Sequence, residues 1–102
     1  MVNIMTKNFA VLGHPISHSL SPKIHQQFAN QLGIKINYQA IDVDIDNFLE
    51  KLHDLKDKGY EGLNITVPLK TLAYESCDHL SLKSQKTKSV NTISIINNRI
   101  YG

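Results

Sequence analysis

The sequence predicts one α/β domain over residues 1–102: a three-layer fold with a mostly parallel sheet, helices on both faces, and an antiparallel strand from a C-terminal hairpin. Two observations predict this class. Short apolar runs typical of buried strands alternate with segments of helical periodicity, and glycines or prolines separate them. The length of 102 residues suits one domain with a modest core. Right-handed crossovers between successive strands then produce a parallel sheet that is covered on both sides.

The first strand and the first helix are marked by their ends. Residues 9–13 form a short apolar run that stops at Gly13, as expected of a buried strand that feeds a loop. Ser21 followed by Pro22 predicts the start of a helix, and Gly33 predicts its end. The apolar residues of this helix recur every four positions and predict one buried stripe, formed by Ile24, Phe28 and Leu32.

A second strand and a second helix follow. Residues 36–43 alternate in part between apolar and polar side chains, which is typical of a strand. Asn47, with Glu50 three positions later, resembles a capping box and predicts a helix that ends at Gly59. The apolar face of this helix is expected to comprise Phe48, Leu49, Leu52 and Leu55.

The remainder of the chain predicts further strands, two short helices and the hairpin. Asn97-Asn98 is typical of a two-residue turn between antiparallel strands. Pro68 ends the strand before it. The strands are expected at residues 62–67, 90–96 and 99–101, and the short helices at about 70–76 and 80–86.

Composition excludes several classes of protein. The net charge is +2 and the lysines are scattered, so nucleic acid is not an expected partner. No apolar run is long enough for a signal-peptide core or a membrane span, and we expect no membrane partner. The single cysteine, Cys77, cannot form an internal disulfide, which fits a reducing compartment. We therefore expect a cytoplasmic protein.

The sequence does not predict a metal site or a nucleotide loop. His14, His18 and His25 lie close together, but Pro15 prevents the first two from sharing a helical face, and no carboxylate motif accompanies them. We expect polar loop histidines and no bound metal. The chain also lacks the glycine-rich fingerprints of dinucleotide and triphosphate sites.

Polar side chains follow strands in three clusters, where open α/β sheets build their ligand sites. The first cluster is residues 13–22, GHPISHSLSP. Ser19 and Ser21 lie two positions apart in a loop that enters a helix N-terminus, and two hydroxyls with free backbone N–H groups suit a carboxylate. The alternative is structural, with Ser21 capping the helix and Ser19 stabilising the turn.

The second cluster is residues 64–70, NITVPLK. Asn64 and Thr66 point to the same side of a strand, and two polar groups on an otherwise apolar strand suit a polyol ligand. Lys70, at the mouth of a cleft, can act as a general acid or base. The alternative for Lys70 is an exposed surface lysine without a catalytic role, which is the commoner situation for lysines.

The third cluster is Val90-Asn91-Thr92, in which Asn91 opens or lines a neighbouring strand or, alternatively, only forms a turn. Together, in this order and spacing, the three clusters resemble motifs of the N-terminal domain in the shikimate dehydrogenase family. Those motifs are GxPxxxSxSPxxH, NxTxPxK and VNT. The resemblance runs from about residue 9 to the last residue of the chain.

The resemblance implies an oxidoreductase that uses NADP to interconvert 3-dehydroshikimate and shikimate, on the route to chorismate and the aromatic amino acids. It implies that Ser19 and Ser21 hold the substrate carboxylate. It also implies that the groups around the ring hydroxyls are Asn64, Thr66 and Asn91. The expected partner is thus a small molecule, shikimate or 3-dehydroshikimate.

The resemblance further implies that Lys70 is catalytic and gives a proton to the substrate oxygen. The family usually has Gly-Ala before VNT, whereas this chain has Lys88-Ser89, a departure that bears on the local loop geometry. The family's aspartate partner of the lysine is expected directly after Gly102, and its NADP-binding domain follows. We therefore expect a truncated substrate-binding domain that is inactive alone.

Two alternatives stay open at this level. A quinate/shikimate dehydrogenase of dual specificity would use the same residues, although a serine at position 19 favours shikimate by resemblance. A stand-alone, non-catalytic binding module would keep the pocket without chemistry. An apolar face exposed where the second domain docks would favour self-association, so a homodimer is one expected state.

Overall fold

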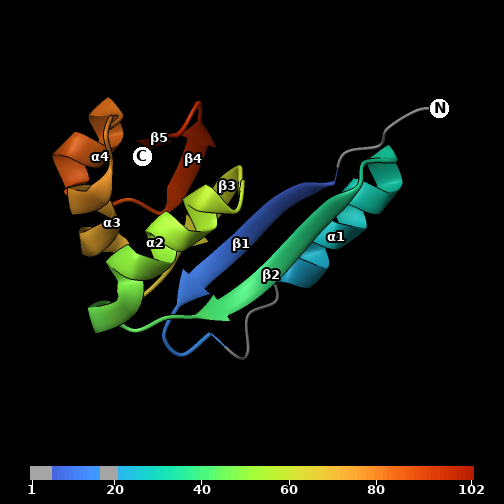
Figure 1. Cartoon of the computed structure of the whole chain (residues 1–102), viewed down its shortest axis with the longest axis horizontal. Helices are drawn as coiled ribbons and strands as arrows, with labels where there is room; N and C mark the ends of the chain where they lie inside the picture. Colours follow the sequence, from blue (N-terminus) through green and yellow to red (C-terminus); the bar gives the residue numbers. More distant parts are fainter. Residues whose placement is uncertain (1–5, 17–20) are drawn as a thin grey trace.

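The computed structural model describes residues 6–16 and 21–102, and its centre is a five-stranded sheet in the order β2-β1-β3-β4-β5 (Figure 1). The strands are β1 (Lys7–Gly13), β2 (Ile36–Asp42), β3 (Gly62–Ile65), β4 (Thr92–Ile96) and β5 (Arg99–Tyr101). β1 pairs in parallel with β2 and β3, whereas β4 pairs antiparallel with β3 and β5. The predicted fold class is confirmed, and β4 of the C-terminal hairpin is the antiparallel strand of the described sheet.

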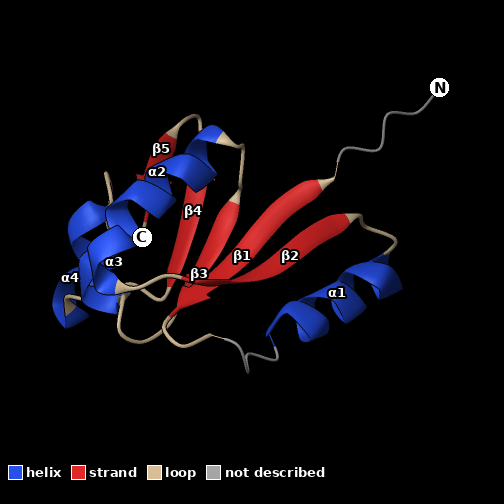
Figure 2. Cartoon of the chain, turned by 60° about the horizontal axis from the view of Figure 1, so that its bottom comes forward, coloured by secondary structure: helices blue, strands red, loops and turns tan. Residues whose placement is uncertain are grey.

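Helices cover both faces of the sheet (Figure 2). α1 (Ser21–Leu32) lies over β2 and β1 on one face. α2 (Phe48–Asp57), which follows a 3-10 turn at Ile45–Asn47, and α3 (Lys70–Ser76) pack on the opposite face, with α4 (Leu82–Thr87) beside α3. None of the described helices is long and apolar enough to cross a membrane.

The main core lies between the sheet and the helices α2 and α3. Successive β1 side chains point to opposite faces, so Ala10 and Leu12 join this core while Val11 points toward α1. The fully buried residues of largest volume are Phe48, Leu12, Leu52, Leu63, Leu69, Ile93 and Val90. The cluster on the α1 face is much smaller and is formed by Val11, Ile16 and Tyr38. The α1 face of β3 and β4 therefore remains accessible to a ligand.

Predictions that rest on local backbone conformation are confirmed. Gly33 and Gly59 have φ values of +70° and +85° at the ends of α1 and α2, where the left-handed region favours glycine. Asn97 and Asn98 have φ values of +50° and +68°, as a type I′ hairpin turn requires. The helix expected at about 70–76 is observed at Lys70–Ser76.

The capping prediction for α2 is wrong. The Asn47 side chain makes no capping bond, and instead its backbone N donates to Asp44 Oδ1 at 3.0 Å. Asp44 thus caps the 3-10 turn, which begins three residues before α2. Leu49, expected on the buried face, is 55% exposed. The helix starts from a turn already ordered by Asp44, so Asn47 is not needed as a cap.

The buried stripe predicted for α1 is also wrong. Ile24, Phe28 and Leu32 are 48%, 61% and 71% exposed. The helix turns Ala29, which is 5% exposed, toward the sheet, because a small side chain lets the helix approach the strands closely. The large apolar side chains lie beside that contact line and face outward. Self-association through an apolar face where a second domain docks stays a prediction.

Candidate functional site

Backbone hydrogen bonds at the end of β3 bring two of the polar clusters together. Ile65 N donates to Asn91 O at 2.9 Å, and Val90 N donates to Lys70 O at 3.0 Å. Ile65 is flanked by the asparagine and threonine of the second cluster, and Val90 precedes the asparagine of the third. The structure therefore gathers Asn64, Thr66, Lys70 and Asn91, which we call the sheet-end cluster.

A buried leucine positions this cluster. Leu69 is fully buried, and its N–H donates to Thr66 O at 3.0 Å, while its carbonyl accepts from Ala73 N at 2.9 Å. Lys70, the next residue, opens α3 and is half-buried, as are Asn64 and Thr66. Half-buried polar groups remain within reach of a ligand, while the buried neighbours hold their backbone in place.

The loop of the first cluster leaves β1 from a position beside Thr66. His14 N donates to Val67 O at 3.1 Å, and Thr66 N donates to Leu12 O at 2.9 Å. A Cβ on Gly13 would overlap the Thr66 methyl group, so glycine permits this close approach. Ser19 and the Ser21 side chain, predicted to hold a carboxylate, lie outside the described residues. Ser21 is the first residue of α1.

An ion pair fixes the start of this loop. His14 Nδ1 lies 2.6 Å from Asp42 Oδ1, and the second carboxylate oxygen accepts from Ile16 N at 3.4 Å. The hydrogen bond to Asp42 raises the pKa of His14, and the hydrogen bond to His14 lowers the pKa of Asp42. Both side chains are about half exposed. This pair holds the start of the loop against β2.

A hollow of about 280 Å³ lies on the α1 face of the sheet, and of the sheet-end cluster it is lined by Asn64 but not by Thr66, Lys70 or Asn91. The Tyr38 hydroxyl donates to Asn64 Oδ1, and the Tyr38 ring stacks on His25 with ring centres 4.4 Å apart. Asn64 and Thr92 lie at the polar part of the hollow, and its apolar part includes Phe9 and Ile36. The arrangement offers amide and hydroxyl groups beside an apolar wall, which suits a small ring that carries hydroxyls.

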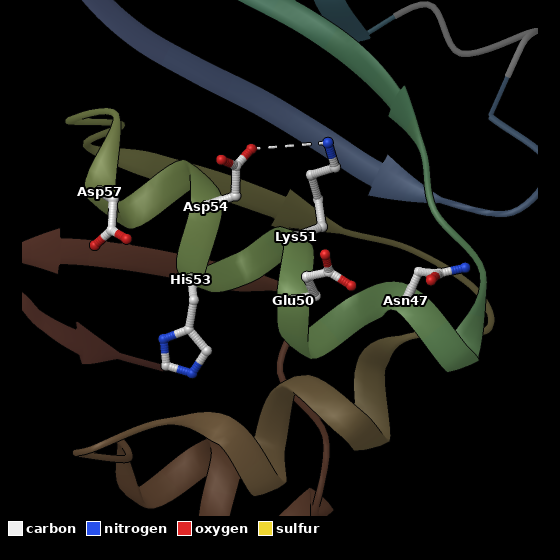
Figure 3. Close-up of a pocket in the computed structure, with 6 residues that line it drawn as sticks. All are labelled: Asn47, Glu50, Lys51, His53, Asp54 and Asp57. Carbon is white, nitrogen blue, oxygen red and sulfur yellow. Dashed lines mark ion pairs between the residues drawn. The ribbon is translucent and has the colours of Figure 1, made fainter.

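A larger hollow, about 650 Å³, lies elsewhere, on the outer surface of α2 (Figure 3). Its walls are Asn47, Glu50, Lys51, His53, Asp54 and Asp57. Lys51 lies 3.8 Å from the Asp54 carboxylate, and Lys58 lies 3.0 Å from it, so this charge is already paired. In Figure 3, Lys51 and Asp54 point toward each other, whereas the other labelled side chains point in different directions and do not gather at one point. This surface is a solvated helix face.

Sequence reasoning missed two side chains beside the cluster, Tyr38 and His25. The sequence pattern predicts only a strand position for Tyr38, although a tyrosine on the same sheet face as Asn64 could have signalled a polar contact. Among residues 6–16 and 21–102, no three histidine, cysteine or acidic side chains are grouped as a metal site would need.

The fold and the sheet-end cluster define an α/β domain with polar side chains gathered where its strands end, the place where open α/β sheets build their ligand sites. Comparison with known families identifies it further, because the family described as "Shikimate dehydrogenase substrate binding domain" matches residues 11–93. The chain belongs to this family.

Individual relatives agree with the family. The chain is 45% identical over 94 residues to shikimate dehydrogenase (NADP(+)) of Xylella fastidiosa (strain 9a5c). The matched region covers 92% of this chain and 33% of that protein. It is 41% identical over 98 residues to the enzyme of the same name from Acinetobacter baumannii (strain ACICU), covering 96% and 37%. The chain thus spans about a third of the length of the curated relatives it matches.

Solved structures share the fold. Shikimate 5-dehydrogenase from Thermus thermophilus, crystallised in complex with NADP(H) and shikimate, superposes with a TM-score of 0.90 at 35% identity. The match covers 94% of this chain and 36% of that one. Agreement at this level over nearly the whole chain shows that this chain and the matching part of the Thermus enzyme share one fold.

Proposed function

We propose that this chain is the substrate-binding part of an NADP-dependent shikimate dehydrogenase, which interconverts 3-dehydroshikimate and shikimate. One observation carries the proposal. Backbone hydrogen bonds gather Asn64, Thr66, Lys70 and Asn91 at the end of β3 in a chain of the substrate-binding family. The Thermus neighbour's description as a complex with shikimate supports the choice of ligand.

The polar groups divide the ligand between them. Asn64, Thr66 and Asn91 bind ring hydroxyls, because amide and hydroxyl groups both donate and accept hydrogen bonds. Ser19 and Ser21 bind the carboxylate with their hydroxyls and with N–H groups at the start of α1. An isolated carboxylate costs free energy to desolvate, so these donors set the ligand's orientation.

Lys70 holds the proton that the substrate oxygen receives on reduction of the carbonyl. Its ammonium also orients that oxygen by a charge-assisted hydrogen bond. NADP supplies hydride chemistry when bound, but the residues of this chain do not fit it. The first strand–helix connection reads GHPISHSLS and lacks the glycine-rich loop that cradles a pyrophosphate. We infer that NADP is held by sequence beyond these 102 residues.

A titration of the 15N-labelled chain with shikimate tests the binding role. We expect amide shifts concentrated at residues 64–70, at residues 90–92 and at residues 19–23, which include the start of α1, and none around the α2 surface of Figure 3. Thr66→Val removes a hydroxyl while keeping the methyl that faces Gly13, and should weaken binding roughly two- to tenfold, the effect of one hydrogen bond. Thr71→Val, at an exposed position of α3, is the matched control.

The same titration with quinate separates the dual-specificity alternative. Equal shifts with quinate would favour it, and shifts with shikimate alone would exclude it. No shift with millimolar shikimate, or shifts only outside the sheet-end cluster, would refute the proposed function.

A second assay tests the division of labour between this chain and its cofactor. With shikimate and NADP⁺ added, the chain alone should give no absorbance from NADPH, because its sequence lacks the glycine-rich loop that cradles a dinucleotide pyrophosphate. Clear turnover would show that the chain binds NADP itself and would contradict the proposal.

A further inference from the structure

A hydrogen bond between two strands that are not neighbours reaches the sheet-end cluster from outside it. The Tyr38 hydroxyl on β2 donates to Asn64 Oδ1 on β3, over the intervening strand β1. The phenol is 9% exposed, and His25 of α1 stacks on its ring at an interplanar angle of 4°. The ring is therefore confined between the sheet and His25, and its hydroxyl has a defined position.

The Tyr38 phenol is protonated at neutral pH and can donate to the Asn64 oxygen. Burial raises the pKa of Tyr38 to about 12, so the phenol keeps its proton at neutral pH. The Asn64 oxygen accepts the hydrogen bond from this hydroxyl. A flip of the amide would place its NH₂ against the phenol oxygen, which is a weaker hydrogen-bond acceptor than the amide oxygen and so gives a weaker hydrogen bond. The hydrogen bond therefore favours one of the two amide orientations.

The favoured orientation has a chemical consequence for the ligand site. An amide carries its oxygen and its NH₂ on opposite sides of one carbon, so an oxygen held by Tyr38 leaves the NH₂ facing away from β2. Two N–H donors then face the side of Asn64 that the phenol does not occupy. A group with two donors recognises an oxygen with lone pairs, as in a hydroxyl or a keto group.

We propose that Tyr38 is a positioning residue for ligand binding, which locks the Asn64 amide so that its Nδ2 donates to a hydroxyl or keto oxygen of the bound ring. This inference rests on the proposed function and deepens it, because it assigns Asn64 a fixed donor role. His25 supports the lock by holding the phenol ring in place.

A purely structural role for Tyr38 is the competing explanation, since it belongs to the small cluster with Val11 and Ile16. The chain offers a matched control. Tyr60 is also 9% exposed, and its hydroxyl donates to the Gln39 side-chain oxygen at 3.0 Å, but Tyr60 belongs to the main core. Tyr38→Phe and Tyr60→Phe each delete one hydrogen bond from a tyrosine hydroxyl to a side-chain amide, and the two tyrosines are equally buried.

The experiment measures the Kd for shikimate by NMR titration of the 102-residue chain and these variants. Tyr38→Phe should raise Kd roughly two- to tenfold, the range of one orienting hydrogen bond, whereas Tyr60→Phe should leave Kd within about twofold. The Asn64 side-chain NH₂ signals should shift in Tyr38→Phe and stay in place in Tyr60→Phe. In an Asn64→Ala background, Tyr38→Phe should change Kd no further.

The possible results separate this inference from the proposed function. A wild-type chain that binds shikimate, with Tyr38→Phe binding equally well, overturns the inference alone. So does an equal weakening in both tyrosine variants, or a full Tyr38→Phe effect in the Asn64→Ala background. A wild-type chain without any shikimate response at the sheet-end cluster refutes the proposed function, and the positioning role fails with it.

Discussion

Leu69→Ala tests whether the buried leucine stabilises the segment that carries the sheet-end cluster. Leu69 is 0% exposed in the main core, between the threonine and the lysine of the second cluster. The substitution removes three carbons, and burial is worth about 0.8 kcal/mol per carbon, so the transfer loss is about 2.4 kcal/mol. The cavity left behind raises the expected loss of unfolding free energy to about 3–5 kcal/mol.

Urea unfolding followed by far-UV circular dichroism measures this loss, and Leu82→Ala is the control. Leu82 is 76% exposed at the start of α4, so the same chemical change there should alter the unfolding free energy by about 0.5 kcal/mol or less. Because the buried Leu69 side chain anchors the segment between Thr66 and Lys70 in the main core, Leu69→Ala should also weaken shikimate binding. Equal losses of stability in the two variants, or a loss below about 1 kcal/mol for Leu69→Ala, would refute the reasoning.

Three further substitutions probe the backbone and the charges near the site. Lys88→Gly should raise the unfolding free energy by about 1 kcal/mol, since Lys88 ends α4 with a φ of +55°, where a Cβ is strained; unchanged urea melts would contradict this. Gly13→Ala should lower stability and raise the Kd for shikimate, because the new Cβ would overlap the Thr66 methyl group; a variant that binds and unfolds like wild type would show that the loop adapts freely. Asp42→Asn should lower stability chiefly between about pH 4 and 6.5. The raised pKa of His14 stabilises the fold fully below pH 6.5, the ordinary pKa of histidine, and this stabilisation is lost as the pH rises through the folded-state pKa of His14. The lowered pKa of Asp42 stabilises the fold fully above pH 3.8, the ordinary pKa of aspartate, and this stabilisation is lost as the pH falls through the folded-state pKa of Asp42. A difference between wild type and Asp42→Asn that is constant with pH would argue against the pair.

Lys88 also explains the departure from the family motif noted in the sequence. The family usually has glycine where this chain has Lys88, and the residue adopts the left-handed conformation that glycine adopts without strain. Two residues later, Val90 donates its N–H to Lys70 O. The substitution therefore affects stability and leaves the sheet-end cluster assembled.

The sequence by itself determined the elements whose signals are local. The ends of α1 and α2 at Gly33 and Gly59, and the turn at Asn97-Asn98, depend on the φ and ψ preferences of a few adjacent residues. The three polar motifs likewise predicted the family and the residues of the sheet-end cluster, because their spacing is a property of the chain alone.

Only the tertiary structure decided which faces and which distant residues meet. The α1 stripe was predicted to be buried because periodicity marks an apolar face, but the docking of Ala29 on the sheet turned that face outward. The contact between Tyr38 and Asn64 joins residues 26 positions apart on strands separated by a third. Strand order and register bring such pairs together, and they result from packing the whole sheet and its helices, which no short segment of sequence encodes.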